Sequence, residues 1–424
     1  MLGFTRLPPW FEGAFAQFEA VFSDSRNVAS FTALTSAVML AEAQRTVSGL
    51  TRGISRPDAK SDRTYRYFLS GADWSATDLA HHAAAFVFDQ LDVGAGDEVL
   101  VHVDDTFIGK TGDATDGVAE LYNPAEGELE QGNKFVTSCI QVGEVYVPYL
   151  ARMYIPEDLA PNFEQPFRKK TEIAVEEIVT LLQLPVGAAL IVVFDSAYYG
   201  GKHVTTIQEQ GHDVVCRYTS SNHVSPLDEV WSQRVDVFAS TLEYEQTTIT
   251  VRGEKKTYHV ASEIVEIEGV GPVKIVASKT DDGTTRYYLS TDLGRSAAEI
   301  LELVEYRWNI ETLHQQSDEK FGFKQYEVER KQAIERYIQL VFLTWTLVTV
   351  SEQADVAFWV ERGGLSVRLD HVKEAYLVET VLNLFEELDP SLPRAERRAV
   401  VHDRVSVLSW SSVANFLITV SEIS

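Results

Sequence analysis

The sequence predicts an α/β fold in which a mixed sheet carries helices on its faces. From Asp97 onward, short apolar runs of strand character alternate with helical segments in the order strand, strand, strand, helix, strand, helix, strand. The chain has 424 residues, more than the roughly 250–300 at which a single core tends to divide. We therefore expect two or three structural units built around one main core.

Residues 1–94 are predicted to be helical. Four phenylalanines between Phe11 and Phe22 recur at spacings of four, three and four, which places them on one face of a helix. A basic stretch with interleaved aromatic residues follows, and that combination suits a nucleic-acid contact. A solvated helix end packed by aromatic residues is the simpler interpretation when the stretch is taken alone. Its basic residues are Arg52, Arg56, Lys60, Arg63 and Arg66.

The middle of the chain supplies the predicted strands, with a helix over Thr171–Gln183 among them. Residues 235–290 alternate threonine and valine around glycine turns, which predicts a β-rich insertion of its own. A further helix begins at Ser296, where Ser296 and Glu299 form a capping box. The strands before the insertion are Glu98–Val103, Lys134–Gln141, Glu144–Met153, Ala188–Phe194 and Asp213–Tyr218.

Two aspartates directly follow apolar strands. Asp104 comes after EVLVHV and Asp195 after AALIVVF. Side chains from neighbouring strands converge at the carboxyl edge of an open α/β sheet, and two carboxylates that share a site can hold divalent metal ions. One aspartate at a strand end is weak evidence, because many only cap loops. Two on the same predicted sheet indicate a candidate site.

The helix that begins at Ser296 offers a third carboxylate. Arg307 and Glu311 lie four residues apart and therefore share one face of that helix. A surface ion pair worth about 0.5 kcal/mol is the simpler explanation. However, Trp308 and Ile310 crowd large groups around the same carboxylate, which favours a positioned group over a solvated one.

The charge balance argues against nucleic-acid binding through the overall field of the protein. Acidic residues number 63 and basic residues 37, so the net charge is −26, and such a field repels nucleic acid and anionic membranes. Positive residues nevertheless cluster at 52–66, 168–170 and 320–336. High acidity with few lysines suggests a host with a salt-rich cytoplasm; an acidic protein from an ordinary host is the alternative.

Cysteine usage and hydropathy exclude other classes. Cys139 and Cys216 are isolated, without the spacing of a metal ribbon or a disulfide framework. The most apolar run, Leu340–Val350, is too short to span a membrane and is predicted to be a buried helix. The N-terminal residues contain no apolar run of signal-peptide length. We therefore expect a cytoplasmic protein with no membrane partner.

Three segments carry a resemblance to a known family: VHVDDTFIGKTG, LIVVFDSAYYG and YYLSTDLGRSAAEILELVEYRWNIE. Over roughly residues 30–350 they resemble the DDE transposases of insertion sequences, in the group with a Tyr–Arg–Glu–Lys signature around its third acid. RWNIE after the STDL strand end is the most specific part. Together with the acidic composition, this resemblance suggests a halophilic archaeal host.

The resemblance implies a ribonuclease-H-like core with a metal-binding triad of Asp104, Asp195 and Glu311. Asp105 is an alternative to Asp104, because a DDT triplet can be aligned in two ways. Two Mg²⁺ or Mn²⁺ ions would activate water for cleavage at the end of the element, and the freed 3′-hydroxyl would then attack target DNA.

The signature around the third acid is only partly kept. Arg307 matches its arginine and is expected to act in catalysis, whereas Val304 and Asp318 stand where the tyrosine and lysine belong. Tyr306 and Lys320 lie two residues later in each case. Cations that would neutralise phosphate charge near the site are Arg307, Lys110, Lys320 and Lys324.

The resemblance also sets the expected domains and partners. A helical DNA-binding region (1–94) precedes the first part of the core (95–234), the β-rich insertion (235–290), the second part of the core (291–360) and a helical C-terminal region (361–424). The partners are double-stranded DNA, as terminal inverted repeats and as target, and a second copy of the chain, because two ends must be synapsed.

Two other interpretations stay open. A decayed or domesticated relative would bind DNA without cutting it; the displaced tyrosine and lysine favour this interpretation, and the presence of all three acids opposes it. A metal-dependent phosphatase of the haloacid-dehalogenase type would need an Asp-x-Asp pair, but Thr106 occupies the second position.

The acidic composition generates a prediction about salt. If the host has a salt-rich cytoplasm, the chain should lose its fold below about molar KCl, because unscreened acidic repulsion then opposes the compact state. Circular dichroism across a KCl series measures this loss. Full stability in dilute buffer would contradict the hypothesis of a salt-rich host.

Overall fold

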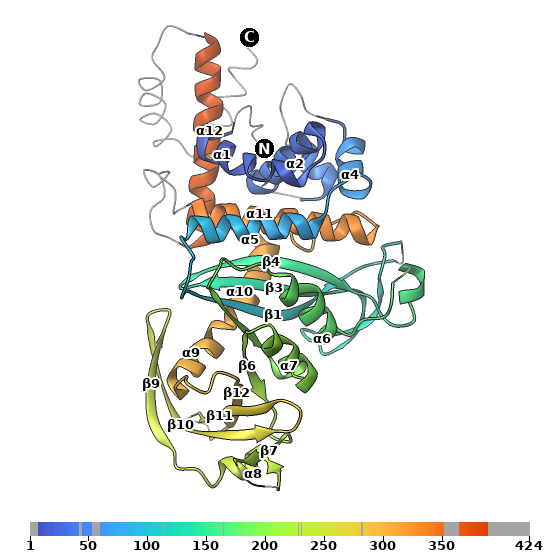
Figure 1. Ribbon diagram of the computed structural model, residues 1–424. Helices are drawn as coiled ribbons and strands as arrows, with labels where there is room; N and C mark the ends of the chain where they lie inside the picture. Colours follow the sequence, from blue (N-terminus) through green and yellow to red (C-terminus); the bar gives the residue numbers. More distant parts are fainter. Residues whose placement is uncertain are drawn as a thin grey trace. The chain divides into compact units, whose positions relative to one another are not determined.

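The computed structural model describes residues 7–41, 45–52, 60–112, 114–163, 165–227, 229, 231–280, 283–351 and 364–388. The chain divides into two compact units (Figure 1). The helical unit consists of Met1–Gln90 and Gln316–Ser424, and the sheet unit consists of Leu91–Gln315. The segment after Gln316, which the sequence assigned in part to the core, thus belongs with the N-terminal helices.

The helical unit is built around one buried helix, α11. Every residue from Arg336 to Val350 is buried, and α11 packs against α2, α4, α5 and α12. Within the described residues, α11 is the one helix long and apolar enough to cross a membrane, and 94% of its most apolar window is buried inside the protein. The described helices of this unit are α1 (Pro9–Ala16), α2 (Ser25–Leu40), α3 (Val47–Arg52), α4 (Asp62–Ser70), α5 (Ala76–Gln90), α11 (Lys331–Val350) and α12 (Leu365–Leu388).

The four N-terminal phenylalanines do share a core, but not one helix. All four are buried, and three of their rings lie 4.8–6.0 Å from the ring of Phe31 on α2. α1 ends at Ala16, and the chain continues through a 3-10 turn at Glu19–Val21. The predicted single helix was therefore wrong beyond Ala16, although the spacing found the correct buried face.

The sheet unit contains a twelve-stranded mixed sheet in the order β2-β3-β1-β5-β6-β12-β11-β10-β7-β8, with β4 paired to β3 and β9 paired to β10. β5 runs parallel to both β1 and β6, and the remaining pairs are antiparallel. The strands are β1 (Glu98–Gly109), β2 (Ala119–Asn123), β3 (Glu128–Val142), β4 (Val145–Tyr154), β5 (Ala189–Phe194), β6 (Asp213–Tyr218), β7 (His223–Pro226), β8 (Gln233–Arg234), β9 (Glu245–Val251), β10 (Glu254–Ile267), β11 (Gly271–Lys279) and β12 (Thr285–Ser290).

Two of the helices expected in the sheet unit are interrupted. The predicted helix over Thr171–Gln183 is one turn of α-helix followed by π and 3-10 turns, ending at Leu181. The helix from Ser296 breaks at Arg307, which caps α9 before α10 begins. The helices are α6 (Lys170–Glu172), α7 (Gly201–Glu209), α8 (Val235–Ala239), α9 (Ala297–Tyr306) and α10 (Trp308–Phe321).

The β-rich segment 235–290 extends the central sheet. β12 pairs antiparallel with β6, with Leu289 opposite Cys216, and β11 and β10 follow in order. The predicted β-rich segment is therefore present, and it continues the central sheet. The reason is that β6 would otherwise present an unpaired edge, and unpaired strand edges are commonly covered by another strand.

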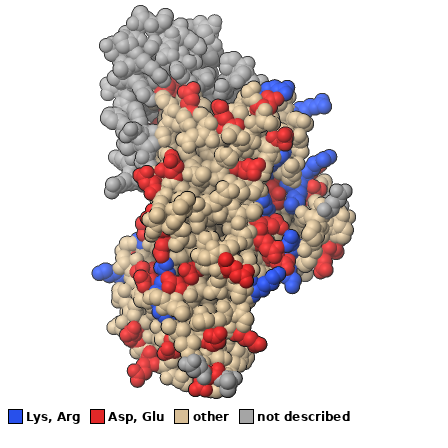
Figure 2. All heavy atoms as spheres, in the orientation of Figure 1, with Lys and Arg blue, Asp and Glu red and all other residues tan. Residues whose placement is uncertain are grey.

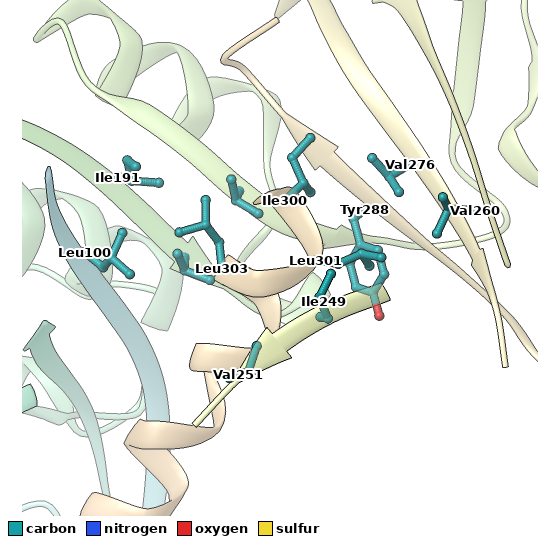
Figure 3. Packing of buried hydrophobic residues seen from close by; sticks show 12 residues of the cluster. Leu100, Ile191, Ile249, Val251, Val260, Val276, Tyr288, Ile300, Leu301 and Leu303 are labelled. Carbon is teal, nitrogen blue, oxygen red and sulfur yellow. The ribbon is translucent and has the colours of Figure 1, made fainter. Parts of the chain in front are cut away.

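Helix α9 is held between the central strands and the β9–β10 hairpin (Figure 3). Its apolar residues Ile300, Leu301 and Leu303 share one buried cluster with Leu100 and Ile191 of the central strands. The other members are Val193, Val215, Ile249, Val251, Val260, Val276 and Tyr288. This packing fixes the end of α9, where Arg307 lies.

Two glycines allow a paired test of the close approach of β3 to β1. A Cβ on Gly132 of β3 would lie 2.4 Å from the backbone oxygen of Ile108 and 2.5 Å from the ring of Phe107. Gly132→Ala should therefore destabilise the protein by about 1–3 kcal/mol. Gly13 in α1 has nothing within 4 Å of such a Cβ, so Gly13→Ala should stabilise it by about 0.5–1 kcal/mol. Urea denaturation measures both changes; a neutral Gly132→Ala would contradict the β1–β3 approach.

Candidate active site

Asp104 and Asp195 lie side by side on parallel strands. Val103 of β1 and Phe194 of β5 are register partners on strands about 4.8 Å apart, and each aspartate is the next residue in the chain, with Asp195 one residue beyond the end of β5. The sequence predicted that this strand ends at Val103, but β1 continues to Gly109 in antiparallel pairing with β3. The carboxylate of Asp195 caps the following 3-10 turn and accepts the backbone N–H of Ser196 at 2.7 Å.

Arg307 bridges the first and third predicted acids. Its Nη2 donates to Oε1 of Glu311 at 2.8 Å, and its Nη1 lies 3.4 Å from Oδ2 of Asp104. The three side chains are 22%, 33% and 26% exposed for Arg307, Glu311 and Asp104. The Arg307–Glu311 ion pair is therefore part of a half-buried cluster of three residues that also includes Asp104. The predicted crowding by Trp308 was wrong, since Trp308 is 56% exposed, whereas Ile310 is buried.

Burial makes the carboxylate of Asp104 hard to ionise. Loss of water raises the pKa of Asp104 to about 6, and the nearby Asp105 and Glu311 add repulsion. The N–H of Asp105 and the Arg307 guanidinium oppose this rise. One guanidinium thus compensates only part of the negative charge at the site.

Asp105 faces the opposite side of the sheet. It accepts hydrogen bonds from Lys170 Nζ at 2.7 Å and from the Tyr198 hydroxyl at 3.1 Å, and Lys134 Nζ lies 3.5 Å away. Burial and the two aspartates hold the pKa of Tyr198 well above its usual value. Successive side chains of a strand point to opposite faces, so Asp104, and not Asp105, shares the side of Arg307 and Glu311.

Helix α10 also touches β3 through His314. Thr137 Oγ1 donates its one proton to the backbone carbonyl of Asp104 at 3.1 Å. It lies 2.6 Å from His314 Nε2 and must therefore accept from that nitrogen. This contact joins the turn after Glu311 to the strand of Asp104.

The donor atoms fit a hard cation, but they do not form a ready metal cage. Asp104, Asp195 and Glu311 offer only carboxylate oxygens, the ligands that Mg²⁺ and Mn²⁺ prefer. Within the described ranges, no three His, Cys, Asp or Glu side chains stand close enough together to hold a metal ion. Arg307 supplies the positive charge between two of these carboxylates.

The predicted DNA-binding cations of the stretch 52–66 differ in their exposure and in their hydrogen-bond partners. Arg63 is exposed on α4, whereas Arg66 pairs with Asp62 at 2.8 Å and Lys60 donates to Ser30 Oγ at 3.0 Å. Arg56 and the side chain of Arg52 lie outside the described residues.

The other predicted cations are also divided between the units. Lys110 directly follows β1 in the sheet unit. Lys320 and Lys324 belong to the helical unit, where Lys324 lies 3.7 Å from Asp318. Arg336, within the basic stretch 320–336, is buried and donates to the carbonyl of Leu69 at 3.0 Å. It therefore adds no surface charge, contrary to the prediction for this stretch.

A cavity of about 700 Å³ borders Asp195 and Arg307. The C-terminal ends of β5 and β6, the β9–β10 hairpin, β12 and the α9–α10 junction line it. Figure 2 shows acidic side chains scattered over one face of the molecule with fewer basic ones between them, so a cationic cavity is a local exception. Its cations are Arg217, Arg252, Lys256, Arg286 and Arg307, beside the acids Asp195, Glu254 and Glu305.

Sequence reasoning missed four of these cations. Arg217, Arg252, Lys256 and Arg286 are separated by up to seventy residues and form no basic run. Only the pairing of β12 with β6 and of β9 with β10 gathers them. The available signal was coarse: Arg217 lies in the predicted strand Asp213–Tyr218, and the other three lie in the predicted β-rich segment 235–290.

Comparisons with known proteins identify a family over most of the chain. Residues 17–235 match the family model described as DDE superfamily endonuclease, and residues 174–347 match the model described as transposase DDE domain. A solved structure, the piggyBac transposase synaptic complex with hairpin DNA, aligns over 96% of this chain and 84% of that one, with 13% identity and a TM-score of 0.46. No curated protein matches the sequence.

The raised pKa of Asp104 predicts how a substitution depends on pH. The folded chain holds this proton more tightly than the unfolded chain, whose aspartate has its ordinary pKa of 3.8. Ionisation therefore costs stability as the pH rises through about 4 to 6, and the full cost remains above that range. Asp104→Asn should stabilise the metal-free protein by about 2–3 kcal/mol at pH 7 and by about 1 kcal/mol less at pH 5.

Urea denaturation with a chelator present measures this difference. The matched control is Asp105→Asn, which removes the partner of Lys134 and Lys170 and should destabilise the protein. A stabilisation by Asp104→Asn that is equal at both pH values, or its absence, would contradict the desolvated carboxylate.

Proposed function

Because the chain belongs to the DDE superfamily of endonucleases, whose model matches residues 17–235, we propose that it is a DNA transposase. It cuts DNA at the ends of an insertion sequence and joins the resulting 3′-hydroxyl to target DNA. The observation that supports this proposal is the link from Asp104 through Arg307 to Glu311, next to Asp195, which directly follows the register partner of Val103 on the neighbouring parallel strand.

Asp104, Asp195 and Glu311 are the residues that would hold a divalent metal, Mg²⁺ or Mn²⁺, and we propose two ions. When bound, the ions supply Lewis-acid stabilisation of the phosphodiester oxygens. The charge at Arg307 supports this assignment, since two carboxylates, Asp104 and Glu311, share its one guanidinium and Asp195 lines the same cavity as Arg307. Asp104 is preferred to Asp105 because Asp105 already has two lysine partners on the other face.

The residues of the chain itself act on the DNA through charge and shape. Arg307 stands between the acids and the cationic cavity, where its guanidinium can bind a phosphate oxygen in the bidentate manner typical of arginine. The cavity cations offset the net charge of −26 only locally, so the field of the whole protein does not draw DNA in. DNA partners, the inverted repeats and a homodimer are part of this proposal.

The decisive experiment uses the DNA that flanks this reading frame. The full-length protein in KCl with Mg²⁺ or Mn²⁺ should produce breaks with 3′-hydroxyl ends at flanking inverted repeats. Asp104→Asn, Asp195→Asn and Glu311→Gln should each reduce cleavage by at least about 100-fold, because each removes a metal ligand. Primer extension maps the breaks, and circular dichroism checks the fold.

Glu128→Gln, which removes an exposed acid on β3, is the matched control and should cut normally. Binding to the repeats without breaks in the wild-type protein would favour a relative that binds DNA without cutting it. Neither binding nor breaks from a folded sample would overturn the proposed function.

A further inference from the structure

The junction between α9 and α10 carries both Arg307 and Glu311, and four hydrogen bonds to other elements hold it at three points of contact. On the β10 side, Tyr258 Oη donates to Glu305 at 2.8 Å and Lys256 Nζ donates to the same carboxylate at 2.5 Å. Tyr306 Oη donates to Glu144 in the β3–β4 turn at 2.6 Å. The third contact comes from the tip of the β9–β10 hairpin and reaches furthest into the protein.

That third contact begins a series of hydrogen bonds that passes through two buried side-chain amides. Arg252 Nη2 donates to Oδ1 of Asn309 at 2.5 Å, and Nδ2 of Asn309 donates to Oε1 of Gln141 at 2.8 Å. The same oxygen of Gln141 lies 2.9 Å from Nε2 of His102. His102 and Gln141 are at most 1% exposed and Asn309 is 4% exposed. The chain therefore runs from the hairpin to the strand of Asp104, two residues before that acid.

Asn309 lies in the middle of this series of hydrogen bonds and in the first turn of α10. It lies two residues after Arg307 and two residues before Glu311. Its amide is used from both sides, with the oxygen bound by Arg252 and the nitrogen bound to Gln141. Burial of this amide makes either loss costly, so the first turn of α10 has one favoured placement relative to β1 and β3.

Arg252 sits in a backbone conformation that its residue type disfavours. Its φ is +53°, in the left-handed region, and the next residue, Gly253, has a φ of +79°. A two-residue hairpin turn of this kind normally carries Asn or Asp at the first position. Asn or Asp would ease the turn but could not reach Asn309, which gives a reason for arginine here.

We propose that the β9–β10 hairpin is a positioning element for the active site, in which Arg252 and Asn309 are positioning residues that fix Arg307 and Glu311 against the strand of Asp104. This role rests on the proposed function only in its effect on DNA cleavage, because the fixing of α10 is a property of the protein alone. It differs from a DNA contact, since it requires Arg252 to act through Asn309.

Hydrogen exchange on the full-length protein separates these roles. Arg252→Ala and Asn309→Ala should each speed amide exchange in the first turns of α10 by about 10-fold, the loss expected of a charge-assisted hydrogen bond worth roughly 1.4 kcal/mol. Exchange in α7, which lacks these contacts, should stay unchanged. If Arg252 and Asn309 act through one shared interaction, amide exchange in the double variant should be no faster than in the faster of the two single variants. Arg252→Lys should retain part of the protection that Arg252→Ala loses.

Cleavage and DNA affinity form the second measurement. Both alanine variants should cut about 10- to 100-fold more slowly, the range for partners that orient metal ligands, and Asn309→Ala, which removes no charge, should keep its DNA affinity by fluorescence anisotropy. Lys255→Ala, which removes an exposed lysine of the same hairpin, is the matched control and should behave as wild type.

The outcomes are distinct. Faster exchange confined to α10 supports the positioning role even if the wild-type protein cuts no DNA, in which case only the proposed function fails. Unchanged α10 exchange in either variant, or strictly additive effects in the double variant, overturns it. Weaker DNA binding by Arg252→Ala with unchanged α10 exchange also overturns it and makes Arg252 a DNA contact.

Discussion

The parallel pairing of β1 with β5 is the constraint on which the candidate site depends. It sets Val103 opposite Phe194, and the two following aspartates come together for no other reason. Parallel pairing requires a long connection between the strands, and here β3, β4 and the irregular helix after α6 fill it. The same connection places β3 beside β1, so the strand of Asp104 is paired on both edges. A carboxylate on such a strand has little freedom to move.

The third acid, Glu311, is held in position by a different set of interactions. It lies on a helix, and a helix must be held by packing and by polar contacts to its sides. Ile300, Leu301 and Leu303 supply the packing of α9 (Figure 3), and Arg307 joins the helical and strand-borne acids by charge. The β-rich segment serves both parts, because β9 covers α9 and the tip of its hairpin reaches α10. It also contributes three of the cavity cations.

Sequence reasoning found what depends on local pattern. Alternation and apolar runs predicted the mixed sheet and its central strands, and the capping box at Ser296 marks the start of α9 in the structure. What it missed depends on distant pairing. The joining of β12 to β6, the break of the helix at Arg307 and the burial of Arg336 leave no local trace. The roles of Asp104, Asp195 and Glu311 stay predictions, and their neighbours Gln141 and Asn309 were not anticipated, since a buried amide pair has no spacing rule.

The alternation along β1 has a consequence for how this chain can change over generations. Asp104 and Asp105 look interchangeable in the sequence, yet they serve opposite faces, one toward Arg307 and one toward two lysines. A single inserted or deleted residue upstream would exchange their places and, in the same event, turn His102 away from Gln141. An error in the position of the acid is therefore also an error in folding. Selection for a stable protein alone therefore guards the register of this strand, even in a lineage that no longer uses the chemistry of Asp104.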